Sequence, residues 1–199
     1  MQVSSERLQM PELQKPGAGL PFFEWLVSKY WVINRLPYKI SWDETQAFFE
    51  RESQKSIEIF ESIPLVLREK RILIDRIPGI EDSSRYWSSA MVLEHLVIVG
   101  SLMSEGMVLL SRGIAPESSV GIADVKPLGG TSSEQVLALF KDFLVTTSHR
   151  MAAEIQNRES KIKLAHPWFG PMDIHQWHWL MAAHHRIHRK QLEAIRDNL

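Results

Sequence analysis

Cysteine is absent from this chain, and so is any marked excess of one charge. Without cysteine the chain can form no disulfide, no thiolate metal ligand and no cysteine nucleophile, a composition that fits a reducing cytosol. Any thiol chemistry would need a thiol supplied by another molecule. The formal net charge is −1 and no basic tract occurs, so we expect no nucleic-acid partner.

Long apolar runs are missing as well. The stretches "FFEWLVSKYWVI" and "MVLEHLVIVGSLM" are shorter than the ~20 apolar residues that span a bilayer, and each carries charged or histidine residues. The first residues contain charges and prolines where a signal peptide needs an apolar segment. We therefore expect a cytoplasmic protein with no membrane partner.

Several catalytic motifs do not occur. The chain has no Walker A loop, no G-x-G-x-x-G and no G-x-S-x-G, so nucleotide binding and serine-hydrolase chemistry lack local support. The sequence "HHRIH" resembles the H-E-x-x-H motif of zinc proteases, but His185 stands where that motif has its glutamate. Since this glutamate is the general base of that class, a protease is excluded.

Four amphipathic segments predict an all-α fold, a four-helix bundle spanning residues 41–199. Residues 1–40 form an N-terminal extension with a short helix around 22–34, whose aromatic side chains we expect against the main body. The first long helix covers 42–63 and ends before Pro64. The second begins within "DSSRYWSS" and ends near Ser111, ahead of Gly113.

The third and fourth helices also have recognisable starts. "TSSE" predicts a capping box that joins Thr131 to Glu134, and Asp173 with Gln176 three residues later predicts the start of the last helix. Apolar stripes on the second and third helices predict core positions that include Leu102 and Leu139. Residues 114–133 form a long Gly- and Pro-rich loop, which we expect to be a mobile wall or lid of a site.

Six of the eight histidines lie between His166 and His188. His184 and His188 are one turn apart on the last helix, about 40° apart around its axis, and share a stripe with apolar residues. Both imidazoles should therefore face inward and could bind one ion. His178 and His185 lie on a flank rotated about 100°, and we expect them at the surface or edge.

His95 interrupts the apolar stripe of the second helix. A lone histidine on an apolar face is more often a hydrogen-bonded core residue than a ligand. Together with His184 and His188, however, it makes three inward imidazoles, which an ion would satisfy. Glu52 and Glu154 are candidates for a fourth ligand or base, although such residues are usually solvated.

Other residues keep two interpretations. His149 could face inward, but a solvated position is the commoner one for a helical histidine. Trp87, Trp177 and Trp179 could line a pocket or simply fill the core.

Three segments in order, "RYWSSAMVLEHL", "HPWFGPMDIHQW" and "HHRIHRKQ", make the chain resemble the DinB-like superfamily, the DinB/YfiT-like putative metalloenzymes. The resemblance covers about residues 41–199. It implies a four-helix bundle in which one histidine of the second helix and two residues one turn apart on the last helix hold a metal. In this chain those residues are His95, His184 and His188.

The resemblance implies a site more firmly than a reaction. Some relatives are transferases or isomerases that use low-molecular-weight thiols, and others are presumed hydrolases. We expect one divalent ion, zinc or nickel first, with iron or copper as alternatives. The expected partners are a small electrophilic substrate and a low-molecular-weight thiol, with a homodimer plausible. The sequence identifies no catalytic side chain. The alternative is a non-catalytic metal-binding or stress-associated bundle.

Overall fold

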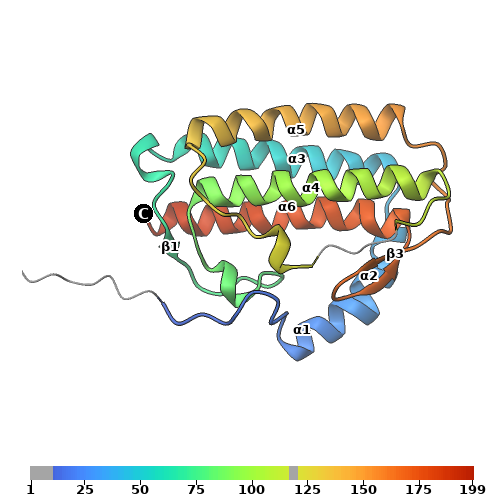
Figure 1. Ribbon diagram of the computed structural model, residues 1–199, viewed down its shortest axis with the longest axis horizontal. Coiled ribbons are helices and arrows are strands. Elements are labelled where there is room, and N and C mark those ends of the chain that lie inside the picture. The colour runs from blue at the N-terminus through green and yellow to red at the C-terminus, as the bar shows by residue number, and fades with distance from the viewer. Residues whose placement is uncertain (1–10, 117–120) are drawn as a thin grey trace, which may run out of the picture.

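Four long helices form the body of the protein (Figure 1). The computed structural model describes residues 11–116 and 121–199. The helices are α3 (Trp42–Ser62), α4 (Ser89–Ser111), α5 (Ser133–Ala153) and α6 (Ile174–Asp197). The expected four-helix bundle is confirmed. Helix α6 packs against both α3 and α4, and α4 also packs against α5.

Each long helix begins at a residue whose side chain caps its first turn. Ser41 and Asp173 form full capping boxes with Glu44 and Gln176, as the sequence predicts. The predicted box at Thr131 is wrong, because α5 begins one residue later. There Ser132 accepts a hydrogen bond from the backbone N–H of Gln135.

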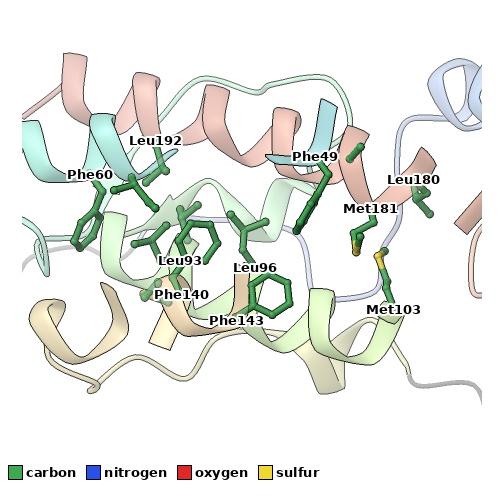
Figure 2. Packing of buried hydrophobic residues seen from close by; sticks show 14 of the residues in the cluster. Phe49, Phe60, Leu93, Leu96, Met103, Phe140, Phe143, Leu180, Met181 and Leu192 are labelled. Carbon is green, nitrogen blue, oxygen red and sulfur yellow. The ribbon is translucent and has the colours of Figure 1, made fainter. Parts of the chain in front are cut away.

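The core lies between the four helices and is built from aromatic, branched and methionine side chains (Figure 2). Phe49, Leu93, Leu96 and Phe140 are completely buried, and each such side chain contributes roughly 1.5–3 kcal/mol by leaving water. Two positions predicted to be buried are not, since Leu102 is 39% and Leu139 is 48% exposed. The buried face of α4 and of α5 is therefore narrower than the apolar stripe that the sequence predicted for each helix.

Two short antiparallel hairpins lie outside the helices, although no strand pattern was apparent in the sequence. One pairs β1 (Ile72–Leu73) with β2 (Tyr86–Trp87), and the other pairs β3 (Leu164–His166) with β4 (Gly170–Met172). Strands of two or three residues are too short to produce a periodic pattern. The second hairpin carries His166.

The expected helix of the N-terminal extension is present as a continuous helical stretch of α1 (Phe22–Val27), a π-turn (Ser28–Val32) and α2 (Ile33–Arg35). A 3₁₀ turn (Pro37–Lys39) leads into α3, and further 3₁₀ turns lie at Leu65–Leu67, Asp82–Ser84 and Ala123–Val125.

The aromatic side chains of this extension do not all pack on the body, which corrects our expectation. Phe22 and Phe23 are 64% and 77% exposed, and Tyr30 is also exposed. Trp25 is an anchor, since its Nε1–H donates to the carbonyl oxygen of Trp168 at 2.9 Å, and Ile33 is buried. A single helix resting on a bundle contacts it along one side, which leaves its other side in solvent.

Helix α4 is, among the described residues, long and apolar enough to cross a membrane by length and composition. It lies within the bundle, and 56% of its most apolar window is buried there. Its apolar character thus fits the core helix of a soluble bundle.

Candidate metal centre

Three histidines from two helices converge on one point. His95 lies in the second turn of α4, and His184 and His188 lie one turn apart on α6. One nitrogen from each ring lies within 4.8 Å of the others. The structure therefore brings together the three residues singled out in the sequence, and their geometry could hold a metal ion.

The protonation of the His95 ring is set by the loop that follows α4. Its Nδ1 lies 2.9 Å from the carbonyl oxygen of Val125, which can only accept, so Nδ1 carries the proton. In the neutral ring Nε2 then has a free lone pair. This Nε2 points to the cluster, where it lies 3.2 Å from Nε2 of His184.

The side-chain amide of Gln191 fixes the proton of His188 on Nδ1 in a similar way. The NH₂ of Gln191 donates to the carbonyl oxygen of Ser84 at 2.7 Å, which fixes the amide's orientation. Its Oε1 therefore accepts a hydrogen bond from Nδ1–H of His188 at 2.7 Å. His188 is left with its Nε2 lone pair, and such a hydrogen-bond partner behind the ring is usual for metal-binding histidines.

His184 has no equivalent partner among the described residues. Its Nδ1 is buried without a hydrogen bond, while its Nε2 faces the lone pair of His95. Two lone pairs at that separation repel unless a proton or a cation lies between them. The donor set of neutral imidazoles, two of them held with Nε2 free, fits a divalent ion such as zinc or nickel.

Burial keeps the three rings neutral. The pKa of His95 is lowered to about 4, chiefly by burial and to a smaller extent by the nearby Lys126 charge, although the hydrogen bond to the Val125 carbonyl opposes this. Burial also lowers the pKa of His184 and His188 well below the usual value, and the positive charges that neighbouring histidines would carry act in the same direction. Neutral imidazole is the form that binds metals, so at neutral pH the three rings are in the protonation state in which they could hold an ion.

A cavity of about 180 Å³ opens beside the cluster. Its walls come from α4, α6, the β3–β4 hairpin, the loop after α4, the segment between β1 and β2 that carries Glu81, and the N-terminal extension, which contributes Leu20, Val32 and Ile33. Ile122, Val125 and Lys126 of the loop line it too, so the loop of residues 114–133 contributes to a wall, while its mobility stays a prediction. Residues 117–120 lie outside the described residues.

A buried ion pair fastens two of these walls together. The Lys126 ammonium contacts the Glu81 carboxylate at 2.7 Å and also donates to the hydroxyls of Ser83 and Ser84. These three partners match the three protons of the ammonium. Although both charged residues line the cavity, Lys126 is thereby occupied in holding the loop and offers no spare charge to a ligand.

The other side of Glu81 holds the extension. Its carboxylate accepts hydrogen bonds from the backbone N–H groups of Gly17 and Gly19. Burial alone would raise the pKa of Glu81, but Lys126 and these two N–H groups outweigh it and lower the pKa. One carboxylate thus ties the extension and the loop to the same edge of the cavity.

His166 presents a hydrogen-bond donor to the cavity. Its Nδ1 accepts from the backbone N–H of Trp168 at 3.1 Å, so the neutral ring carries its proton on Nε2. The ring stacks on Phe169 with centroids 4.5 Å apart, and burial lowers its pKa to about 4. Among the described residues Nε2 has no hydrogen-bond partner, and His166 lines the cavity wall.

The expectation that His178 and His185 lie at the surface or edge is wrong, because both are buried. His185 stacks against Phe140 and Phe143 and contacts Ser53 through Nδ1 at 2.8 Å. His178 packs on Trp42 with ring centroids 4.0 Å apart. Helix α6 is buried on two faces, one toward the cavity and one toward the bundle core. The sequence prediction assumed one inward-facing stripe on this helix, and for that reason it placed His178 and His185 at the surface or edge.

The candidate acidic ligands lie elsewhere. Glu52 is buried, but its carboxylate is bound by Arg189 at 2.6 Å. The Glu154 carboxylate is 43% exposed and pairs with Arg112 and Arg150. Neither lines the cavity, and His149 is exposed, as the commoner interpretation expects.

The tryptophans divide between pocket and core. Trp179 lines the cavity, whereas Trp87 is buried behind it, against the rings of His95 and His188. Trp177 lines a neighbouring cavity.

Several contributors to the site were missed in the sequence. The carbonyl of Val125 carries no side-chain signal, and Lys126 is one lysine among many in a loop. The positions of His166 and Gln191 within the quoted segments were a signal, but the role of His166 depends on its ring tautomer and that of Gln191 on its amide orientation, and only the hydrogen bonds reveal these.

Comparisons with known proteins agree with the architecture. No family model and no curated protein matches the chain. A solved structure, "Crystal structure of TT2238, a four-helix bundle protein", matches with a TM-score of 0.55 and 21% identity, over 77% of this chain and 98% of that one. The chain is a four-helix bundle. At this identity the likeness shows the fold alone.

Proposed function

We propose that this protein is a cytoplasmic, DinB-like metal-dependent enzyme that binds one divalent ion through His95, His184 and His188. One observation carries the proposal. Hydrogen bonds to Val125 and Gln191 hold two imidazoles with their Nε2 lone pairs free at a shared point beside a cavity. Zinc and nickel are the leading ions.

The number of ligands favours catalysis over a purely structural ion. Structural zinc sites are normally closed by four protein ligands, whereas catalytic sites keep a position for water or substrate. Among the described residues the cluster holds three donors, with no carboxylate or fourth histidine. When bound, a divalent ion at such a position lowers the pKa of a water or thiol to near neutrality.

The surrounding residues determine what the site can accept. The cavity walls are mainly apolar, and their two charged residues neutralise each other. A small uncharged electrophile therefore fits better than a strongly charged one. The Nε2–H of His166 could donate to the oxygen or leaving atom of that electrophile, because it needs no change of protonation at neutral pH.

The two reaction types differ in the nucleophile. Hydrolysis would use water, and thiol-dependent S-transfer would use a low-molecular-weight thiol, since the chain has none of its own. In S-transfer the sulfur forms a bond to the electrophilic carbon, and the leaving group departs with the bonding electrons. The thiol proton goes to solvent or to the leaving group.

The test combines metal content with an activity screen. The purified chain is reconstituted with zinc, nickel, iron or copper, its metal is measured by mass spectrometry, and each form is screened with electrophiles plus cellular thiols and with simple esters and amides. We expect about one ion per chain and turnover that is lost in His184→Ala but kept in His149→Ala. Binding of one ion without any turnover would favour the non-catalytic bundle, and no ion at all would overturn the site.

A further inference from the structure

A second cavity, of about 290 Å³, adjoins the first. Five residues line both cavities, which makes them neighbouring compartments of one crevice: Val99, Met103, Ile122, Val125 and His166. The second compartment extends between α4 and the β3–β4 hairpin, away from the histidine cluster. We call it the side compartment.

The lining of the side compartment is predominantly apolar. Its own lining is apolar apart from Glu105, which is exposed on α4. The indole N–H of Trp177 already donates to the carbonyl oxygen of Leu164 at 3.2 Å. The other polar side chain of the lining is His166, which lines both compartments.

This chemistry distinguishes two possible occupants. Cellular low-molecular-weight thiols carry charged or strongly polar groups, and such groups lose free energy when buried without partners. An alkyl or aryl chain gains free energy on entering an apolar compartment. The side compartment therefore suits the apolar part of the electrophile and not the thiol.

We propose that the side compartment binds an alkyl or aryl tail of the same molecule whose polar head lies at the histidine cluster. The proposal deepens the proposed function by naming a substrate class, a small electrophile with an apolar tail, and it rests on that function for the position of the head. Together the two compartments approach the size of ordinary ligand pockets.

A ligand series of increasing tail length tests this. Straight-chain hydroxamic acids, from acetohydroxamate to decanohydroxamate, are titrated calorimetrically into the nickel- or zinc-loaded full-length chain. The hydroxamate head chelates the ion, and each methylene buried should tighten binding about fourfold until the crevice is full. Equal affinities from the shortest to the longest acid would overturn the proposal.

Variants that fill the side compartment locate the tail. Gly106→Leu and Leu109→Trp change residues that line this compartment alone. A Cβ at position 106 would lie 3.0 Å from a terminal carbon of the Leu164 side chain, which can move aside. Both variants should leave acetohydroxamate affinity unchanged and remove the gain from longer tails. Val145→Trp, at an exposed position of α5, is the matched control.

A metal-free arm separates this proposal from the metal site. Straight-chain amides of the same lengths are added to chelator-treated protein, and the methyl resonances of Leu109 and Leu164 are followed. Shifts that grow with tail length, and that Gly106→Leu suppresses, would support the side compartment even if no ion bound. Unchanged methyl resonances would overturn it, whatever the metal content.

Discussion

The Nδ1 of His188 lies 2.7 Å from Oε1 of Gln191. The amide is itself fixed by its hydrogen bond to the Ser84 carbonyl oxygen, so the orientation of the His188 ring depends on a backbone group 107 residues away from Gln191 in the chain. A ligand ring held from behind in this way binds an ion without first having to be ordered.

Gln191→Leu should therefore weaken metal binding by about 10- to 100-fold without changing the number of ions bound at saturation. Competition with a chromophoric chelator measures the affinity. Gln54→Leu, an exposed substitution on α3, is the control and should bind as the wild type does. An unchanged affinity in Gln191→Leu would mean that the amide does not orient the ring.

Single substitutions of His95, His184 and His188 by Ala should each remove high-affinity binding of the ion, because two imidazoles alone form an incomplete site. Mass spectrometry of the reconstituted variants gives the ion content. His149→Ala, on the exposed face of α5, should retain about one ion per chain.

His185→Ala should act on stability and not on the ion. The ring is fully buried against Phe140 and Phe143. Its removal leaves a cavity and deprives the Ser53 hydroxyl of a hydrogen-bond partner. We expect a loss of roughly 2–4 kcal/mol in the free energy of unfolding. Urea denaturation measures this loss, and metal titration of the folded variant should match the wild type. A stable variant that bound no ion would place His185 in the site instead.

Burial lowers the pKa of His178 to about 3, helped by the charges of His175 and Arg158. In the unfolded chain an ordinary histidine takes up its proton near pH 6.5. Between these two values the unfolded state holds one more proton, so this residue makes stability fall as the pH decreases below 6.5, by up to about 1.4 kcal/mol per pH unit. Above pH 6.5 it contributes no pH dependence.

His178→Phe keeps a ring beside Trp42 and removes the titration. Urea denaturation of wild type and variant between pH 7 and 4.5, both with chelator, should show a shallower loss of stability in the variant, by about one proton per molecule. Parallel curves would mean that His178 is accessible to protons in the folded state.

Glu81→Gln should loosen two wall segments at once. The substitution removes the charge that pairs with Lys126 and weakens acceptance from Gly17 and Gly19. Hydrogen exchange should quicken both in residues 14–20 and in 121–130. Asp43→Asn breaks the exposed pair with Arg158 and should change neither segment, since such surface pairs contribute little. Faster exchange in one segment alone would contradict the shared tie.

The bundle and the three converging histidines were accessible from sequence because both follow helical periodicity. Local sequence patterns predict local structure reliably. Examples here are the helix caps at Ser41 and Asp173 and the one-turn spacing of His184 and His188. His178 and His185 were misplaced because periodicity tells how residues are arranged around a helix but not how many faces of that helix are covered.

The outer parts of the site could not be found in the same way. Val125 acts through its backbone carbonyl, and Lys126 meets Glu81 across a long stretch of chain. His166 lies in a three-residue strand, too short for any period to show. These contacts depend on loop conformation, which the sequence pattern constrains weakly.

The position of Trp87 gives the cluster an optical reporter. Its indole is stacked on His188, with an interplanar angle of 7°, and its ring centroid is 5.1 Å from that of His95. Any ion held by those two rings lies beside a fluorophore. Copper and nickel, whose unfilled d shells accept excitation energy, would quench its emission, whereas zinc, with a filled shell, would leave it bright. Fluorescence of the wild type against Trp87→Phe therefore separates bound zinc from bound copper or nickel without removing the metal from the protein.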